Sequence, residues 1–278
     1  MHQTDKNSAE MKLSDILPSY AIDRKIESKK IKRAIYAPIS AGTDLVQRVD
    51  PNFYTTKIDE WEPPLLISEK YKFGYVLNPL CASRTIVHHL VKKPDINYKP
   101  KFIGLKTTKT RVKKSYKNIE KFTIVRHPFE KLVSGYRKQV LNANTIRKLS
   151  MLSQYEELKP QMSFKNFVQW LCKNRENKGA FDSHWAPHSH IFSGLPDGLS
   201  PSRFIKLENL QNGYKKFCEK NKIPYYKLPH LRSSKSLMHS GKEDTRDQYL
   251  NSLSTKSIEC LKEIYSRDFQ CFEYSYKT

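Results

Sequence analysis

The sequence predicts an α/β fold with a central, mostly parallel sheet flanked by helices. Two stretches read as a strand that runs directly into a helix. Residues 71–77 (YKFGYVL) precede a helical segment over 85–93, and residues 122–125 (FTIV) precede a helix that starts at Pro128. In α/β folds such junctions gather at the carboxyl ends of the strands, where ligands bind. A length of 278 residues suits one large domain.

The chain is strongly basic, with 50 Lys and Arg residues against 28 Asp and Glu and a formal net charge of +22. This excess favours a polyanionic partner: nucleic acid, an anionic membrane surface or an acidic polysaccharide. The alternative is a lysine-rich surface that is simply well solvated. No apolar stretch approaches the roughly 18 residues of a membrane span, so we expect no transmembrane segment.

The five cysteines, Cys81, Cys172, Cys218, Cys260 and Cys271, are scattered along the chain. Their odd number and the lack of a C-x-x-C pair indicate neither a disulfide framework nor a zinc site. We therefore expect no metal and a reducing compartment.

Residues 1–70 are polar, contain a basic run over 24–33 and match no motif. We interpret them as a partly ordered N-terminal extension and assign residues 71–278 to the main domain.

The loop over residues 78–84 (NPLCASR) separates the first strand from its helix. Backbone N–H groups at a helix start bind an anion irrespective of side chain, as they do in P-loops. The strand–loop–helix order therefore predicts a phosphate-binding loop.

The central stretch, residues 121–140 (KFTIVRHPFEKLVSGYRKQV), places Arg126 at the end of a buried strand. Pro128 suits the first position of a helix, and Phe129 and Leu132 begin its apolar stripe. Ser134 falls on the other side of this helix, where its hydroxyl can face the same space as Arg126. A guanidinium and a hydroxyl near a helix start suit a phosphate group; the alternative is a surface ion pair and a solvated serine.

The string RHPFEKLVSGYRK over 126–138 resembles the 3′-phosphate-binding motif of sulfotransferases that use 3′-phosphoadenosine 5′-phosphosulfate (PAPS), and is most similar to the carbohydrate (Golgi-type) members and their bacterial relatives. The resemblance implies a P-loop-like sulfotransferase fold. It also implies that Arg126 and Ser134 hold the 3′-phosphate of the donor. Lys131 stands where relatives often carry arginine.

The 79–86 segment (PLCASRTI) resembles, in part, the family's 5′-phosphosulfate loop. The residues expected to bind the donor there are Pro79, Cys81, Ala82, Ser83, Arg84 and Thr85. Leu80 replaces the family's lysine and cannot neutralise charge on the leaving phosphate. We expect Arg84 to take that role; otherwise activity is weak or absent.

Residues 181–188 (FDSHWAPH) resemble the family's D-x-H-W-x-P element. Transfer to a hydroxyl needs a base, and histidine is the usual candidate near neutral pH. We therefore name His184 and His188 as catalytic candidates. The alternative is that His184 and Trp185 pack the substrate cleft without titrating.

Two further segments extend the resemblance over residues 71–276. The 228–235 segment (LPHLRSSK) resembles the late loop that closes over the nucleotide, with Arg232, Ser233 and Ser234 as donor-binding candidates. The 202–210 segment (SRFIKLENL) is similar to a family segment in which Glu208 would position its neighbours.

The resemblance implies transfer of a sulfuryl group from PAPS to a carbohydrate hydroxyl without a metal, and the charge favours an anionic glycan such as a glycosaminoglycan or other polysaccharide. The alternatives are a catalytically impaired sulfotransferase-fold protein and a basic nucleic-acid-binding protein. No nucleic-acid partner is expected, since no recognition helix, RNA-binding aromatic signature or zinc spacing is present. We expect a cytoplasmic, bacterial-type enzyme, or a Golgi-lumenal one whose anchor has been removed.

Overall fold

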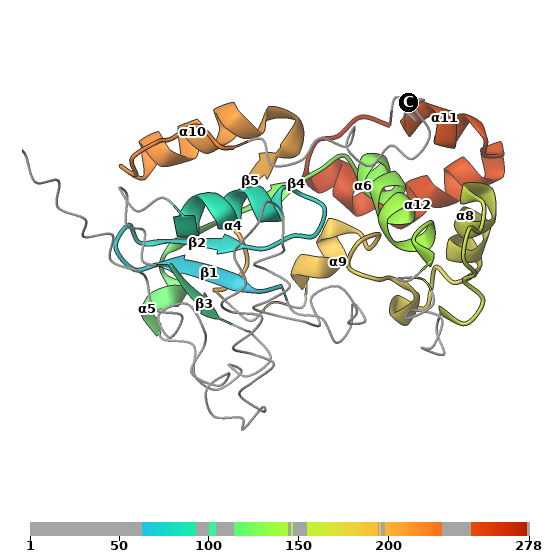
Figure 1. Cartoon of the computed structure of the whole chain (residues 1–278), viewed down its shortest axis with the longest axis horizontal. Helices are drawn as coiled ribbons and strands as arrows, with labels where there is room; N and C mark the ends of the chain where they lie inside the picture. Colours follow the sequence, from blue (N-terminus) through green and yellow to red (C-terminus); the bar gives the residue numbers. More distant parts are fainter. Residues whose placement is uncertain are drawn as a thin grey trace, which may run out of the picture.

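The computed structural model describes residues 63–92, 100–103, 114–143, 146, 155–193, 195, 198–229 and 246–276 (Figure 1). The strands are β1 (Leu65–Ser68), β2 (Phe73–Val76), β3 (Pro100–Ile103), β4 (Glu120–Val125) and β5 (Arg203–Lys206). The helices are α4 (Ser83–Lys92), α5 (Lys114–Lys117), α6 (Pro128–Gly135), α8 (Phe164–Lys173), α9 (His188–Ser193), α10 (Leu210–Lys220), α11 (Arg246–Asn251) and α12 (Thr255–Cys271). Shorter turns are a π-helical turn (Tyr136–Val140) and two 3₁₀ turns (Lys178–Ala180 and Leu207–Asn209).

The five described strands form one sheet in the order β3-β1-β2-β4-β5. Strands β2, β4 and β5 are parallel neighbours, whereas β1 is antiparallel to both β2 and β3. Four strands therefore run in one direction and β1 runs against them. This confirms the predicted α/β class with a mostly parallel sheet.

Strand β1 lies before residue 71, in the part of the chain that the sequence suggested was an extension. Leu65, Leu66 and Ile67 are fully buried, and β1 pairs with β2 through a short turn in which Lys72 has φ +54°. The sheet therefore begins within that segment. Whether residues 1–62 form an extension stays a prediction, because they lie outside the described residues.

Helices cover both faces of the sheet. On one face, Phe122 of β4 meets the rings of Phe217 and Tyr214 of α10 at 4.4 and 5.9 Å, and α4 packs beside them. On the other face, Phe204 of β5 meets Phe192 of α9 at 6.0 Å. Figure 1 shows α6, α8, α11 and α12 gathered at one end of the sheet. This end lies beyond the carboxyl edge of β4, from which α6 continues.

A disulfide between Cys172 and Cys260 joins α8 to α12. The expectation from the sequence that no cysteines pair is therefore wrong. The two residues are 88 positions apart, and only the packing of α8 against α12 brings their Cα atoms to 6.1 Å. Disulfides are typical of oxidising compartments, so the cysteines no longer argue for a reducing one. Cys81, Cys218 and Cys271 are free.

None of the helices in the described ranges combines the length and the apolar character that a membrane crossing requires.

Opening the Cys172–Cys260 disulfide should destabilise the protein. In the chain-entropy model, a closed loop of 88 residues contributes up to about 4–5 kcal/mol to the free energy of unfolding. We expect Cys172→Ser to lower that free energy in urea titrations under oxidising conditions. Cys271→Ser, which changes an exposed free cysteine, is the control and should unfold like the parent. Coincident unfolding curves for the parent and Cys172→Ser would contradict the pairing.

Candidate functional site

The carboxyl ends of β2 and β4 lie side by side, as the sequence predicts. The strands are parallel, with Tyr75 opposite Phe122. The loop that follows β2 and the turn that follows β4 therefore emerge next to one another. Helix α6 begins at Pro128, so Arg126 occupies the junction between strand and helix.

The loop after β2 has the backbone of an anion-binding concavity. Leu80 and Ala82 have φ of +61° and +54°, and Cys81 between them does not. Alternation of left- and right-handed residues turns successive N–H groups inward, as in the nests that bind phosphate. Helix α4 starts directly afterwards at Ser83.

The predicted loop residues are brought together here. Pro79, Cys81 and Ser83 are buried, whereas Ala82, Arg84 and Thr85 are partly exposed around the first turn of α4. Burial raises the pKa of the Cys81 thiol to about 12, although the charges of Lys131 and Arg126 oppose the shift. The thiol is therefore neutral, and the polar groups that the loop offers are those of its backbone and the α4 side chains.

Asn78 and His188 connect the two loops below the site. Asn78 Nδ2 donates to the carbonyl oxygen of Ile124 on β4, at 2.8 Å, and lies 2.9 Å from His188 Nδ1. A carbonyl oxygen only accepts, so the amide orientation is fixed and Nδ1 must accept as well.

His188 also contacts the backbone of Arg126. Its Nε2 lies 2.9 Å from the Arg126 carbonyl oxygen and 3.2 Å from the Arg126 nitrogen. Because Nδ1 accepts from Asn78, a neutral ring carries its proton on Nε2, which then donates to the carbonyl. Burial lowers the pKa of His188 well below its ordinary value, and the charge of Lys131 adds to this effect. His188 is thus a neutral brace under the β4 turn.

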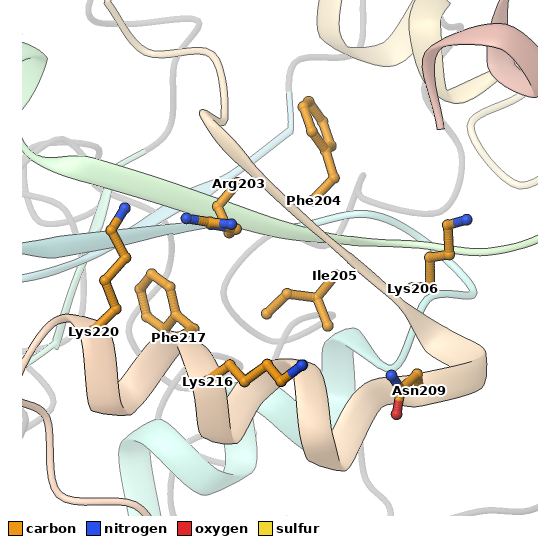
Figure 2. A pocket seen from close by; sticks show the side chains of 9 residues that line it. Arg203, Phe204, Ile205, Lys206, Asn209, Lys216, Phe217 and Lys220 are labelled. Carbon is orange, nitrogen blue, oxygen red and sulfur yellow. The ribbon is translucent and has the colours of Figure 1, made fainter. Parts of the chain in front are cut away.

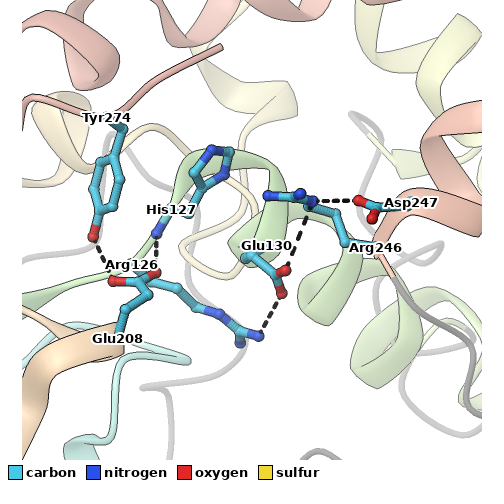
Figure 3. A network of polar contacts seen from close by, with 7 residues as sticks. All are labelled: Arg126, His127, Glu130, Glu208, Arg246, Asp247 and Tyr274. Carbon is cyan, nitrogen blue, oxygen red and sulfur yellow. Dashed lines mark hydrogen bonds and ion pairs between the residues drawn. The ribbon is translucent and has the colours of Figure 1, made fainter. Parts of the chain in front are cut away.

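The Arg126 side chain points along α6 to Glu130 (Figure 3). The guanidinium lies 3.1 Å from Glu130 and is 16% exposed, and Arg246 approaches the other Glu130 oxygen at 3.8 Å. Ser134 is one turn beyond Glu130 on the same helix face, which fits the predicted pairing of Arg126 with Ser134. The guanidinium has five N–H donors, so the contact with Glu130 leaves donors for an anion.

Glu208 has the positioning role that the sequence suggested. Its two oxygens accept from the His127 N–H at 2.8 Å and from the Tyr274 hydroxyl at 2.9 Å (Figure 3). It therefore attaches both the end of β4 and the C-terminal segment to the turn after β5.

His184 lies in the buried core beside α6. Its Nδ1 is 2.5 Å from Asp182 Oδ1, and its side chain is 0% exposed. Burial lowers the pKa of His184, against the opposing effect of the Asp182 charge. A Cβ on Gly135 would lie 2.8 Å from the His184 carbonyl oxygen, so glycine is required next to Ser134 for this close approach.

Two buried charged residues were not recognised as site residues in the sequence. Lys131 Nζ donates to the Ala186 carbonyl oxygen at 2.6 Å, and burial lowers the pKa of Lys131 to about 8. Asp268 accepts from the backbone N–H groups of His188 and Ser189 at 2.6 and 2.8 Å, so it caps the start of α9. The sequence signal for both was their place inside family-like motifs, at 126–138 and near the C-terminus.

Arg232, Ser233 and Ser234 lie outside the described residues, so their donor-binding role stays a prediction. In the ranges that are described, no three His, Cys, Asp or Glu side chains form a group that could hold a metal ion.

The buried histidines should make stability depend on pH. In the unfolded chain His188 binds a proton below its ordinary pKa of about 6.5, whereas the folded ring, whose pKa burial lowers, does not. The free energy of unfolding therefore falls as pH drops through this value. The maximum slope is about 1.4 kcal/mol per pH unit for each such histidine. In urea titrations between pH 7 and pH 5, His188→Gln should show a shallower slope than the parent. Equal slopes would mean that His188 titrates normally in the fold.

One of three comparisons with known proteins gave a match. A family model described as the sulfotransferase family matches residues 63–275, and the match begins just before β1. The comparison with curated proteins and the comparison with solved structures each found no match. The family match covers the strand ends, the loop after β2, Arg126 and the 181–188 element. The chain therefore belongs to the sulfotransferase family.

Proposed function

We propose that the protein transfers a sulfuryl group from PAPS to a hydroxyl group of an anionic carbohydrate. The observation that carries the proposal is the side-by-side placement of the nest-like loop after β2 and Arg126 after β4. Two anion-binding features at adjacent strand ends suit a donor that carries phosphate at both its 5′ and its 3′ positions.

In this proposal the donor is held at two points. The backbone N–H groups of the loop, together with Ser83 and Thr85, bind the 5′-phosphosulfate, and Arg126 and Ser134 bind the 3′-phosphate. The phosphate competes with Glu130 for the Arg126 guanidinium. The late-loop candidates Arg232, Ser233 and Ser234 would close over the nucleotide.

Catalysis would rest on positioning and electrostatics. The acceptor oxygen bonds to sulfur while the bond from sulfur to the bridging phosphate oxygen breaks. The loop amides and Arg84 stabilise the negative charge that develops on the leaving phosphate, in place of the lysine that Leu80 replaces. If the protein binds the nucleotide but transfers no sulfuryl group, the alternative of a catalytically impaired sulfotransferase-fold protein would be favoured. The specific argument for that alternative is Leu80, which stands in place of the family's lysine.

His184 is the proposed base. Asp182 orients its ring by accepting a hydrogen bond from Nδ1–H, so that Nε2 carries the lone pair. The side chain is fully buried, so the acceptor must displace the residues that cover it. His188 is a poorer candidate, because both of its ring nitrogens face hydrogen-bonding partners.

Arg126→Ala should weaken binding of the product nucleotide, 3′-phosphoadenosine 5′-phosphate, by about 1.5–3 kcal/mol, and Ser134→Ala by about 1 kcal/mol. The first change removes a charge-assisted contact and the second a neutral one. Isothermal titration calorimetry measures both, with Arg175→Ala, in the exposed turn after α8, as the control. Arg126→Ala protein that binds the nucleotide as tightly as the parent would refute the donor site.

His184→Ala should reduce turnover by about 10²–10⁴-fold while nucleotide affinity stays unchanged, because a positioned base acts only on the chemical step. Single-turnover transfer from labelled PAPS measures the first quantity, and calorimetry measures the second and reports that the variant folds. The exposed His190→Ala is the control. A near-parental rate would leave His184 as a packing residue.

A further inference from the structure

A groove of about 470 Å³ runs between the edge strand β5 and helix α10. Its volume falls in the range of ligand-binding clefts. Figure 2 shows Ile205 of β5 turned toward Phe217 and Lys216 of α10, whereas the side chains of Phe204 and Lys206 point away from α10. The lining residues include Arg203, Lys206, Lys216, Lys220, Phe204 and Phe217. We call this feature the β5–α10 groove.

The β5–α10 groove carries an excess of positive charge. Four lining residues are cationic and none is acidic. The carboxylate of Glu120, outside the lining, pairs with Lys220 at 2.9 Å and with Arg203 at 3.6 Å. Within the described ranges no other carboxylate pairs with the four cations. Lys206 donates instead to the carbonyl oxygen of Glu273, which is neutral.

Backbone donors of β5 also face the side away from β4, where no strand of the described residues pairs with it. The Ser202 N–H donates to the Lys121 carbonyl oxygen of β4. In a parallel pair alternate residues point to the same neighbour, so Arg203 and Ile205 direct their N–H and C=O groups away from β4. The Phe204 ring does not add to the groove, because it lies on the other face of the sheet, against Phe192 of α9. Cations and outward amides together suit a ligand with anionic groups and hydroxyls.

One end of the β5–α10 groove adjoins the donor site. Lys206 and Asn209 line that end, and Glu208 between them accepts from the backbone of His127, next to Arg126. The other end, at Arg203 and Lys220, lies one strand length away, roughly 10–13 Å for a four-residue strand. A linear ligand lying along β5 would therefore have one end near the site of transfer.

We propose that the β5–α10 groove binds a stretch of carboxylated or sulfated polysaccharide remote from the hydroxyl that is sulfated. This inference rests on the proposed function, because the donor site defines which end of the chain reacts. Cations spread along an open groove match a polymer with a charge in each repeating unit, whereas a single small anion favours convergent donors.

The test compares two double variants of equal charge. Lys216→Gln/Lys220→Gln removes two groove cations, and Lys215→Gln/Lys222→Gln removes two exposed lysines outside the lining. Long-range attraction falls equally in both, so a difference between them reports local contact. The probes are a chondroitin sulfate decasaccharide, the matching disaccharide and a ten-nucleotide single-stranded DNA. Affinities are measured by calorimetry, and binding of 3′-phosphoadenosine 5′-phosphate is measured for each protein.

Lys216→Gln/Lys220→Gln should bind the decasaccharide at least about fivefold more weakly than Lys215→Gln/Lys222→Gln does. The disaccharide is too short to span the groove, so the two variants should bind it equally. Raising the salt concentration should weaken decasaccharide binding to the parent. Equal decasaccharide affinities for the two variants, or no binding by the parent, would overturn the groove assignment. If the parent bound the DNA more tightly than the decasaccharide, and Lys216→Gln/Lys220→Gln weakened that DNA binding, the ligand of the groove would be nucleic acid and not polysaccharide. A parent that fails to bind the nucleotide would instead refute the proposed function.

Discussion

The hydrogen bonds of the His188 ring are the constraint on which the site depends. One nitrogen accepts from Asn78 at the end of β2 and the other donates to the carbonyl of Arg126 at the end of β4. The contact with Asn78 is buried and the contact with Arg126 is partly buried. Losing the Asn78 partner would leave a buried polar group unsatisfied, at a cost of about 1–3 kcal/mol. The ring thereby fixes the distance between the loop after β2 and the turn after β4, and it can do so only while it is neutral.

A buried polar layer supports this brace from below. Asp268 caps the start of α9, Lys131 holds the Ala186 carbonyl, and the Tyr265 hydroxyl donates to the Trp185 carbonyl. These contacts attach the 181–188 element to α6 and α12. Buried charges are retained where each has partners with good geometry. The layer therefore lies beneath the turn that carries Arg126, whose side chain contacts Glu130.

Positive charge lies in two places in the described structure, one buried in the interior and one exposed on the surface. Lys131 is buried in the interior, with its amine on the Ala186 carbonyl oxygen. The β5–α10 groove instead carries exposed lysines on α10, Lys216 and Lys220, together with Arg203 and Lys206 on the edge strand β5, where charges also discourage sheet-to-sheet association. An enzyme organised in this way would stabilise the leaving group with amides and arginine, and would attract its acceptor with the outer surface.

The sequence by itself determined the features that depend on local spacing. The strand before Arg126, the helix start at Pro128, the buried stripe of Phe129 and the strand–loop–helix order after β2 all follow from neighbouring residues, because periodicity and proline act within one turn or strand. Only the tertiary structure decided the rest. The Cys172–Cys260 pair, the brace from Asn78 to His188 and the cap from Asp268 to α9 join residues 80 to 110 positions apart. No local pattern encodes such contacts, since they exist only once helices and strands have packed.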